Sequence, residues 1–308
     1  MHVAILGAGA LGRVYGARLA MRAPVEVSFV VRPAMLHENA PFLLERVDDR
    51  DDVLRLESPA RVSDIPAHAD VVLVCVRAEQ LDDDLVKLLA CRPTIPTVML
   101  TPMMPGDYER MRTLLGPRVI AAMPGVVAYV RDDGVVRYWV PRTAPTLIEE
   151  QRPVNEAVTE LERMLTRAGL HTKTELGVHE SNPATTVTFI PIAMALDVGG
   201  GVDALLDDEA LLDVALRAAS EGLELAHRIG KVATWASLLT KFVSRATLKI
   251  GIGIAKQKAP EAIFYAEMHF GRKLHAQNVA MAEAIVRLAE EKGTPHAALA
   301  ELRDRLKR

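Results

Sequence analysis

A glycine-rich turn lies directly after the first expected strand of the chain, residues 2–6. The residues of this turn are Gly7, Ala8, Gly9, Ala10, Leu11 and Gly12. A strand, a G-x-G-x-x-G turn and a helix in this order are typical of dinucleotide-binding folds. Gly7 permits the tight bend, Gly9 lets the pyrophosphate approach the backbone, and Gly12 lets the helix lie close to the strand. Free N–H groups at the helix start favour phosphate, so we expect residues 7–12 to bind a dinucleotide.

The residue after the second expected strand bears on the choice between NAD and NADP. NAD enzymes place an acidic residue there, because a carboxylate accepts hydrogen bonds from the ribose hydroxyls. This chain instead has Arg32 after Phe29-Val30-Val31. A guanidinium can bind the 2′-phosphate of NADP through two parallel hydrogen bonds. A solvated surface arginine is the alternative interpretation, and we predict NADP(H) as the cofactor.

A nicotinamide transfers hydride, and carbonyl reduction also needs a proton donor, a polarising group and an anchor for the substrate. His269 and Lys273 are spaced i,i+4 on an expected helix, and Glu267 belongs to the same segment. His269 can act as a general acid, whereas Lys273 can protonate the substrate or bind its carboxylate. Asn182 and Thr186 lie one helical turn apart and can orient a substrate. A solvated charged face is the alternative interpretation of the three charged candidates.

The N-terminal half must position the cofactor groups, and its pattern predicts a parallel sheet. Short β-branched runs alternate there with helical stretches, which is typical of βαβ units. The continuous apolar run at 69–76 is expected of a central strand that is buried on both faces. Asp132-Asp133-Gly134 between two short apolar runs predicts a hairpin. We expect strands at 2–6, 25–31, 69–76, 97–100, 119–122, 126–130 and 135–140, helices at 10–23, 81–90, 107–115 and 154–168, and short strands at Leu147 and 170–174.

Strand signals end near residue 175, and the remainder of the chain has helical periodicity. Gly230 and Gly293 end two of these segments just past the last turn. The expected helices are 185–197, 202–229, 232–249, 260–292 and 295–307. The predicted fold class is therefore α/β, with a Rossmann-type doubly wound parallel sheet domain at 1–174. An all-α domain for substrate binding and dimerisation follows at 175–308.

Composition and charge exclude several classes of function. With 37 basic and 40 acidic side chains, the chain offers no general electrostatic reason to bind nucleic acid or an anionic membrane. No apolar run reaches the ~18 residues of a membrane span, and we expect no signal peptide. Cys75 and Cys91 have no CxxC or Cys/His cluster beside them, and no HExxH occurs, so we expect neither disulfide nor metal. These observations favour a cytoplasmic protein that acts on small molecules.

Several segments together match the pattern of one known family. The matches are residues 5–12, Arg32, Gln80, Pro124-Gly125 and Asp133-Gly134. In these segments the chain resembles the ketopantoate reductases (2-dehydropantoate 2-reductases). The family's cofactor-contacting lysine is replaced here by Arg77, three residues before Gln80. The resemblance implies hydride transfer from NADPH to the carbonyl of a 2-oxo acid, a step of pantothenate biosynthesis, by a two-domain enzyme. We also predict a homodimer.

The chain departs from this family at positions that the resemblance assigns to the chemistry. The family has a histidine-asparagine-glycine motif after its fifth strand, where this chain has Thr101-Pro102-Met103-Met104. The resemblance thus implies that Pro102 lies beside the cofactor in place of an asparagine. The family's lysine before the first C-terminal helix falls near Asn182, which keeps a donor but carries no charge and has no useful acidity. We therefore expect poor reduction of ketopantoate itself.

The main interpretation is an NADPH-dependent oxidoreductase that reduces a small 2-oxo acid or a related carbonyl compound. One alternative is a divergent reductase or dehydrogenase with an unrelated, more apolar substrate, which the paired methionines Met103 and Met104 favour. A second alternative is a non-catalytic NADPH-binding or regulatory protein. Pro102 and the missing lysine favour that interpretation.

Overall fold

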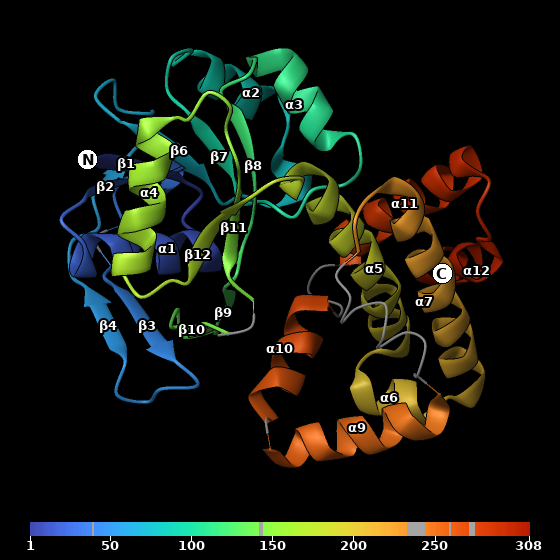
Figure 1. The fold of residues 1–308 in the computed structure, drawn as a ribbon. Helices are drawn as coiled ribbons and strands as arrows, with labels where there is room; N and C mark the ends of the chain where they lie inside the picture. Colours follow the sequence, from blue (N-terminus) through green and yellow to red (C-terminus); the bar gives the residue numbers. More distant parts are fainter. Residues whose placement is uncertain (39, 142–143, 233–243, 259, 271–274) are drawn as a thin grey trace. The chain divides into compact units, whose positions relative to one another are not determined.

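The computed structural model describes residues 1–308 except 39, 142–143, 233–243, 259 and 271–274 (Figure 1). For residues 258, 262 and 268–270 it describes the backbone alone. The chain divides into two compact units, Met1–His179 and Glu180–Arg308. The sequence analysis placed this boundary after residue 174.

The larger sheet of the first unit has eight strands. They are β1 (His2–Leu6), β2 (Glu26–Val30), β5 (Arg61–Val62), β6 (Val71–Val74), β7 (Thr97–Met99), β8 (Val119–Met123), β11 (Thr146–Glu149) and β12 (Thr172–Glu175). Their order is β12-β11-β8-β7-β6-β1-β2-β5, and all neighbours from β8 to β5 run parallel. Only the β8–β11 pair of this sheet is antiparallel. The order reverses at β1, as in doubly wound folds, so the expected fold class is confirmed.

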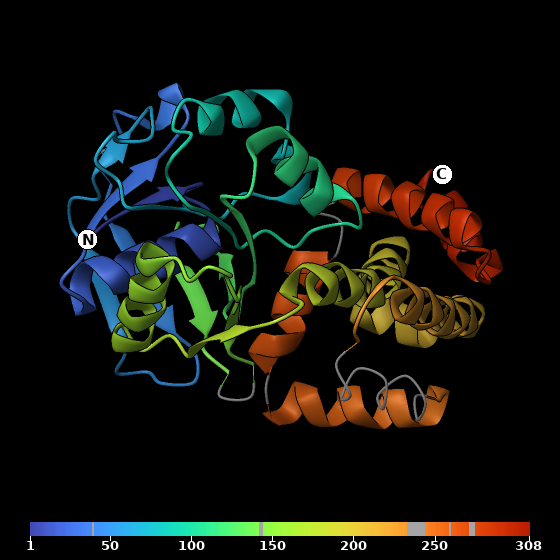
Figure 2. The same cartoon turned by 45° about the horizontal axis from the view of Figure 1, so that its top comes forward.

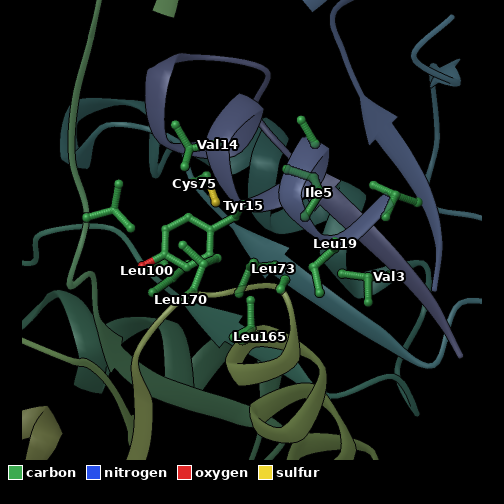
Figure 3. Close-up of a cluster of buried hydrophobic side chains, with 14 of the residues drawn as sticks. Val3, Ile5, Val14, Tyr15, Leu19, Leu73, Cys75, Leu100, Leu165 and Leu170 are labelled. Atoms are coloured by element: carbon green, nitrogen blue, oxygen red, sulfur yellow. The ribbon is translucent and has the colours of Figure 1, made fainter. Parts of the chain in front are cut away.

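Helices cover both faces of this sheet (Figure 1, Figure 2). One face packs against α1 (Ala10–Arg22) and α4 (Glu156–Arg167), and the other against α2 (Asp83–Ala90) and α3 (Asp107–Leu115). Side chains alternate between the faces of a strand. In β1, Ile5 therefore packs with Tyr15 and Leu165 on the α1 side, as Figure 3 shows, whereas Leu6 belongs to the opposite cluster. A strand covered on both faces is apolar along most of its length, which explains the continuous runs at 3–6 in β1 and 71–74 in β6.

The smaller sheet of the first unit has four strands, which the sequence analysis predicted only in part. They are β3 (Phe42–Arg46), β4 (Val53–Leu56), β9 (Val127–Val130) and β10 (Val136–Trp139), in the order β4-β3-β10-β9. The hairpin of β9 and β10 is confirmed, and Gly134 in its turn has a φ of 84°. Strands β3, β4 and β5 were missed. They are short and half exposed, and charged residues interrupt their apolar positions.

A buried arginine joins α1 to the rest of the first unit. The Arg18 side chain is 1% exposed, and its guanidinium donates to Asp52 Oδ2 at 2.8 Å and to Tyr138 Oη at 2.7 Å. Its Nε donates to the carbonyl oxygen of Ala168 at 2.9 Å. Arg22 also contacts Asp52, at 2.6 Å. Buried charges are tolerated when they are paired and hydrogen-bonded, so this network holds α1 in place behind the glycine turn.

The second unit is helical throughout its described part. Its helices are α5 (Val178–Gly199, which begins in the first unit), α6 (Val202–Asp207), α7 (Glu209–Ile229), α9 (Arg245–Lys258), α10 (Pro260–Phe270), α11 (His275–Lys292) and α12 (Ala297–Leu306). The single helix expected at 202–229 was wrong. Asp208 divides it, because its side chain accepts a hydrogen bond from the Leu211 N–H at 2.8 Å and caps α7. The expected helix 260–292 corresponds to α10 and α11, and residues 271–274 between them lie outside the described residues.

Other helix bounds shift by a few residues or more. The expected helix 185–197 begins earlier, at Val178, and runs through Pro183 and Pro191. Most of the expected helix 232–249 lies outside the described residues, and α9 extends past its expected end to Lys258. Among the described helices, none has the length and apolarity to cross a membrane.

Candidate dinucleotide-binding site

The carboxyl ends of four neighbouring parallel strands form one edge of the larger sheet. Leu6 of β1 is aligned with Val30 of β2 and Val74 of β6, and Val74 is aligned with Met99 of β7. The predicted cofactor residues follow this row within three positions along each strand. These residues are the glycine turn from Gly7, Arg32, Arg77 and Pro102. Residues that are up to 95 positions apart in the sequence therefore lie at the same edge of the sheet.

The glycine turn has the geometry that its sequence predicts. Gly7 has a φ of 101°, a conformation that L side chains rarely adopt. A Cβ atom on Gly12 would lie 1.9 Å from the carbonyl oxygen of Gly7, so α1 packs directly on the turn. A Cβ on Gly9 would meet no atom within 4 Å. Because α1 begins at Ala10 without a side-chain cap, its first N–H groups remain available to an anion beside Gly9.

Arg13 contacts the turn, and Arg61 lies against the same aromatic ring as Arg13; neither residue was predicted from the sequence. Arg13 Nε donates to the carbonyl oxygen of Ala8 at 2.8 Å and thereby braces the turn. The guanidinium groups of Arg13 and Arg61 lie 4.6 and 4.9 Å from the centroid of the Phe42 ring. Burial, and then the charge of Arg61, lowers the pKa of Arg13. The only sequence signal was the position of Arg13 directly after the motif, since Phe42 and Arg61 belong to the missed strands.

Arg32 lies two positions after β2, at the start of a short 3-10 helix at Pro33–Met35. Its side chain is exposed and makes no hydrogen bond or ion pair with the residues that the structure describes. No acidic residue follows β2 directly, because the chain continues Val31-Arg32-Pro33. This end of the sheet therefore presents an uncompensated guanidinium where a carboxylate would serve NAD.

Arg77 and Gln80 form a small turn after β6. The backbone N–H of Arg77 donates to Gln80 Oε1 at 3.0 Å, which fixes the glutamine side chain against the turn. The Arg77 side chain is half exposed and pairs with Glu79 at 2.9 Å. Its charge is thus partly offset by its neighbour. A ligand at this position would meet a guanidinium–carboxylate pair rather than the lone cation of a lysine.

The segment after β7 contains both a buried and an exposed part. Thr101 is buried, and its hydroxyl donates to the carbonyl oxygen of Val76 at 2.9 Å, which ties this segment to the end of β6. Pro102 is exposed at the edge. Met103 is 1% exposed and packs in the apolar cluster on the α2–α3 face. Met103 is therefore a core residue and does not favour an apolar substrate. The half-buried Met104 is the methionine that still does.

The candidate residues on α5 form a local pair. Asn182 is 2% exposed, and the Thr186 hydroxyl donates to Asn182 Oδ1 at 3.4 Å. The contact confirms that the two residues lie one turn apart on the same side of the helix. The amide of Asn182 is thus oriented by its own helix.

The remaining candidates belong to α10 and the residues after it. Glu267 Oε1 accepts a hydrogen bond from the Val202 N–H at 2.9 Å. It thereby caps α6, which begins after Gly201 and has no side-chain cap of its own. Glu267 therefore has a structural hydrogen bond, whereas the alternative interpretation of the sequence had its side chain solvated. His269 lies on α10 with its side chain outside the described part, and Lys273 lies outside the described residues.

Comparisons with known proteins find similarity to the ketopantoate reductases. Residues 3–143 match the family model described as ketopantoate reductase PanE/ApbA. The 2-dehydropantoate 2-reductase of Pyrococcus horikoshii is 25% identical over 236 residues, which cover 75% of each chain. The crystal structure of 2-dehydropantoate 2-reductase from Geobacter metallireducens aligns with a TM-score of 0.71 at 17% identity, over 100% of this chain and 99% of that one.

A further solved structure of the same fold has a different printed name. It is a ternary complex of D-mandelate dehydrogenase with NADH and anilino(oxo)acetate. Its TM-score is 0.70 at 15% identity, over 100% of this chain and 97% of that one. The resemblance to ketopantoate reductases is confirmed, and the match to the family model spans every predicted cofactor residue. The structural alignments extend the shared fold to the helical unit.

Proposed function

We propose that this protein is an NADPH-dependent oxidoreductase of the ketopantoate reductase type, which reduces a small 2-oxo acid or a related carbonyl compound. The observation that carries the proposal is the row of strand ends where the glycine turn, Arg32, Arg77 and Pro102 meet. Ligands of doubly wound sheets bind outside the carboxyl ends of the strands, where the strand order reverses. The match of residues 3–143 to the family supports the same class of reaction.

The first unit supplies what the pyrophosphate of a dinucleotide requires. The open space beside Gly9 admits a phosphate close to the backbone. The first N–H groups of α1 and the positive end of its dipole face that space. Arg13 holds the turn in shape through the carbonyl oxygen of Ala8. NADPH, when bound, supplies the hydride, and these residues hold and orient it.

The preference for NADPH over NADH rests on Arg32. An exposed guanidinium that has no partner among the described residues can form a bidentate pair with the 2′-phosphate. Arg61 lies on the strand beside β2, with its backbone aligned with Phe29, and adds a second positive charge to this end of the sheet. Since the D-mandelate dehydrogenase of similar fold was solved with NADH, both nucleotides belong in the test.

At the reacting end, the proposal assigns different tasks to different residues. Asn182, oriented by Thr186, can donate a hydrogen bond to a substrate oxygen but cannot supply a proton at neutral pH. We assign the cation or acid to Lys273 or His269, the two predicted residues whose side chains have suitable chemistry. Glu267 is the weakest of the catalytic candidates, because its carboxylate already accepts a hydrogen bond from the Val202 N–H and caps α6.

A second candidate function is NADPH binding without catalysis. Two observations favour it: the family lysine is replaced by Asn182, and that residue is 2% exposed. A regulatory protein of this kind would keep the glycine turn and Arg32 and lose the proton donor. The third possibility is a divergent reductase that acts on another substrate. The half-buried Met104 is the one methionine of the pair that still favours an apolar substrate.

The deciding experiment measures binding and chemistry separately. Calorimetry gives the affinities for NADPH and NADH, and single-turnover oxidation of bound NADPH is then followed against a panel of 2-oxo acids that includes ketopantoate. Oxidation with one or more of these acids supports the reductase. Tight NADPH binding without oxidation by any of them favours the non-catalytic protein. Absence of nucleotide binding contradicts both. Sedimentation of the same samples tests the predicted homodimer.

A further inference from the structure

Three potential metal ligands meet at the edge of the larger sheet that lies opposite the glycine turn. His2 begins β1, Glu26 begins β2, and His68 lies in the segment just before β6. These three strands are neighbours and run parallel, so their amino-terminal ends share one edge. No short sequence motif links these three residues, so the spacing of residues along the chain did not predict a metal site.

The ligand atoms of these residues converge. His2 Nδ1 lies 3.9 Å from Glu26 Oε1, and His68 Nε2 lies 4.0 Å from the same oxygen. All three atoms lie within 4.8 Å of one another. The two imidazole rings have their centroids 4.5 Å apart. Two imidazole nitrogens and one carboxylate oxygen thus lie close enough together to be potential ligands of one ion.

The buried imidazole of His2 has one nitrogen that its surroundings leave unsatisfied. Its side chain is 5% exposed, and Nε2 forms a hydrogen bond with the Ser28 hydroxyl at 2.9 Å. Nδ1 is buried and has no hydrogen-bond partner among the described residues. Either tautomer leaves Nδ1 unsatisfied, which is unfavourable for a buried polar atom. With the proton on Nε2, the ring donates to Ser28 and directs the lone pair of Nδ1 toward Glu26, as in metal-bound histidines.

The local charges favour a cation. Glu26 carries one carboxylate, and Asp70 adds a second, which accepts a hydrogen bond from the His2 backbone N–H at 2.7 Å. Burial lowers the pKa of His2; Glu26 and Asp70 oppose this shift, whereas His68 and the amino group of the chain reinforce it. Two carboxylates thus lie at the start of β1, where their negative charge attracts a cation.

We propose that His2 Nδ1, the Glu26 carboxylate and His68 Nε2 form a binding site for a divalent transition-metal ion of the zinc type. Two imidazoles and a carboxylate are ligands that suit Zn²⁺. In a tetrahedral site with bonds of ~2.0–2.1 Å, ligand atoms lie roughly 3.3 Å apart. The two nitrogen–oxygen distances of 3.9 and 4.0 Å must therefore shorten by roughly 0.6–0.7 Å, and the two nitrogens, which lie within 4.8 Å of each other, must also approach. Glu26 and His68 have side chains that are 69% and 68% exposed, so they are free to move toward the fixed His2.

The ion would cross-link three strand ends and leave the nucleotide edge untouched. It would join the starts of β1 and β2 to the segment before β6, and binding to the folded state alone raises the unfolding temperature. His2 and Leu6 are separated by roughly 13 Å along β1, at ~3.3 Å per residue. Nucleotide affinity should therefore be independent of the metal, so the site and the proposed function can fail separately.

The test titrates Zn²⁺ into untagged, chelator-treated full-length protein. Competition with a zinc indicator gives stoichiometry and affinity, and thermal unfolding gives the stabilisation. The variants are His68→Ala and Glu26→Gln, both at exposed positions, with His171→Ala as a matched control because His171 is exposed and far from the cluster in sequence. We expect one equivalent of Zn²⁺ and a raised unfolding temperature in the wild type and in His171→Ala. Each ligand variant should lose at least tenfold in affinity while unfolding, without metal, at the wild-type temperature.

Cobalt supplies a second readout that does not depend on stability. Co²⁺ bound to two imidazoles and a carboxylate has visible absorption bands, which should appear in the wild type and disappear in His68→Ala. The proposal is overturned if the wild type binds no stoichiometric Zn²⁺. It is equally overturned if His68→Ala and Glu26→Gln bind as tightly as His171→Ala. Nucleotide affinity measured on the same variants should not change, which separates this site from the dinucleotide site.

Discussion

The carbonyl oxygen of Gly7 lies where a side chain at Gly12 would begin, since a Cβ atom there would be 1.9 Å from it. The neighbour is backbone, so it cannot rotate away as a flexible side chain could. At Gly9, by contrast, an added Cβ meets no atom within 4 Å. The two glycines therefore have different roles: packing requires Gly12, whereas Gly9 leaves open space beside the first turn of α1.

Gly12→Ala should destabilise the fold of the first unit. The methyl group forces α1 away from the glycine turn, and such overpacking typically costs about 1–3 kcal/mol, or more where backbone must move. Thermal or denaturant unfolding measures the loss. An unfolding free energy equal to that of the wild type would contradict the close approach of Gly12 to Gly7.

Gly9→Val should fold normally and lose NADPH binding, because its side chain occupies the space of the pyrophosphate. The backbone of Gly9 is extended, with a φ of −76°, so valine is tolerated there. Calorimetry measures the affinity, and circular dichroism checks the fold. Gly9→Ala, with a smaller side chain, should lose less affinity. A folded Gly9→Val protein that binds NADPH as well as the wild type would remove the basis of the proposed cofactor site.

Arg32→Asp should reverse the cofactor preference. The change removes a cation from the 2′-phosphate, adds repulsion and offers acceptors to the ribose of NAD. Loss of a charged hydrogen-bonding pair is worth ~1.5–3 kcal/mol, or roughly ten- to hundredfold in affinity. Arg50→Asp, at an exposed position of the turn between β3 and β4, is the control with the same change in net charge. Equal binding of NADH and NADPH by the wild type would make Arg32 a surface residue only.

Arg18→Ala should lower the free energy of unfolding by about 3 kcal/mol, the lower end of the range for breaking a buried ion pair. The lower end applies because Arg22 still contacts Asp52, at 2.6 Å. Arg167→Ala, which changes an exposed arginine of α4, should have little effect. Denaturant titration compares the three proteins. Equal losses in both variants would show that the buried network does not stabilise α1.

Reduction of ketopantoate should be slow even if NADPH binds well. Asn182 supplies neither the charge nor the acidity of the family lysine. General acid catalysis alone typically raises a reaction rate by ~10²–10⁴-fold. Single-turnover and steady-state rates with ketopantoate measure the deficit. If a better substrate is found, its turnover should fall in the Lys273→Ala/His269→Ala double variant. Efficient ketopantoate turnover that this double variant does not diminish would show that Asn182 is wrongly aligned with the lysine.

Local patterns in the sequence were sufficient for the cofactor turn and for most of the larger sheet. Glycine spacing, the apolar run at 69–76 and the Asp132-Asp133-Gly134 turn depend on neighbours within a few residues, and the structure has the expected elements at all three. The i,i+4 contact of Asn182 with Thr186 is equally local. Such features follow from backbone sterics and side-chain periodicity, which act over one turn of helix or a few residues of strand.

Only the tertiary structure decided which distant residues meet. Met103 is buried in the core of the first unit. Glu267 caps a helix that begins 65 positions earlier in the chain. The Arg13–Phe42–Arg61 cluster depends on strands too short and too polar to have a clear period. His2, Glu26 and His68 meet because β2, β1 and β6 are adjacent and parallel. Strand order arises from burial on both faces of the whole sheet, and no local run of residues encodes it.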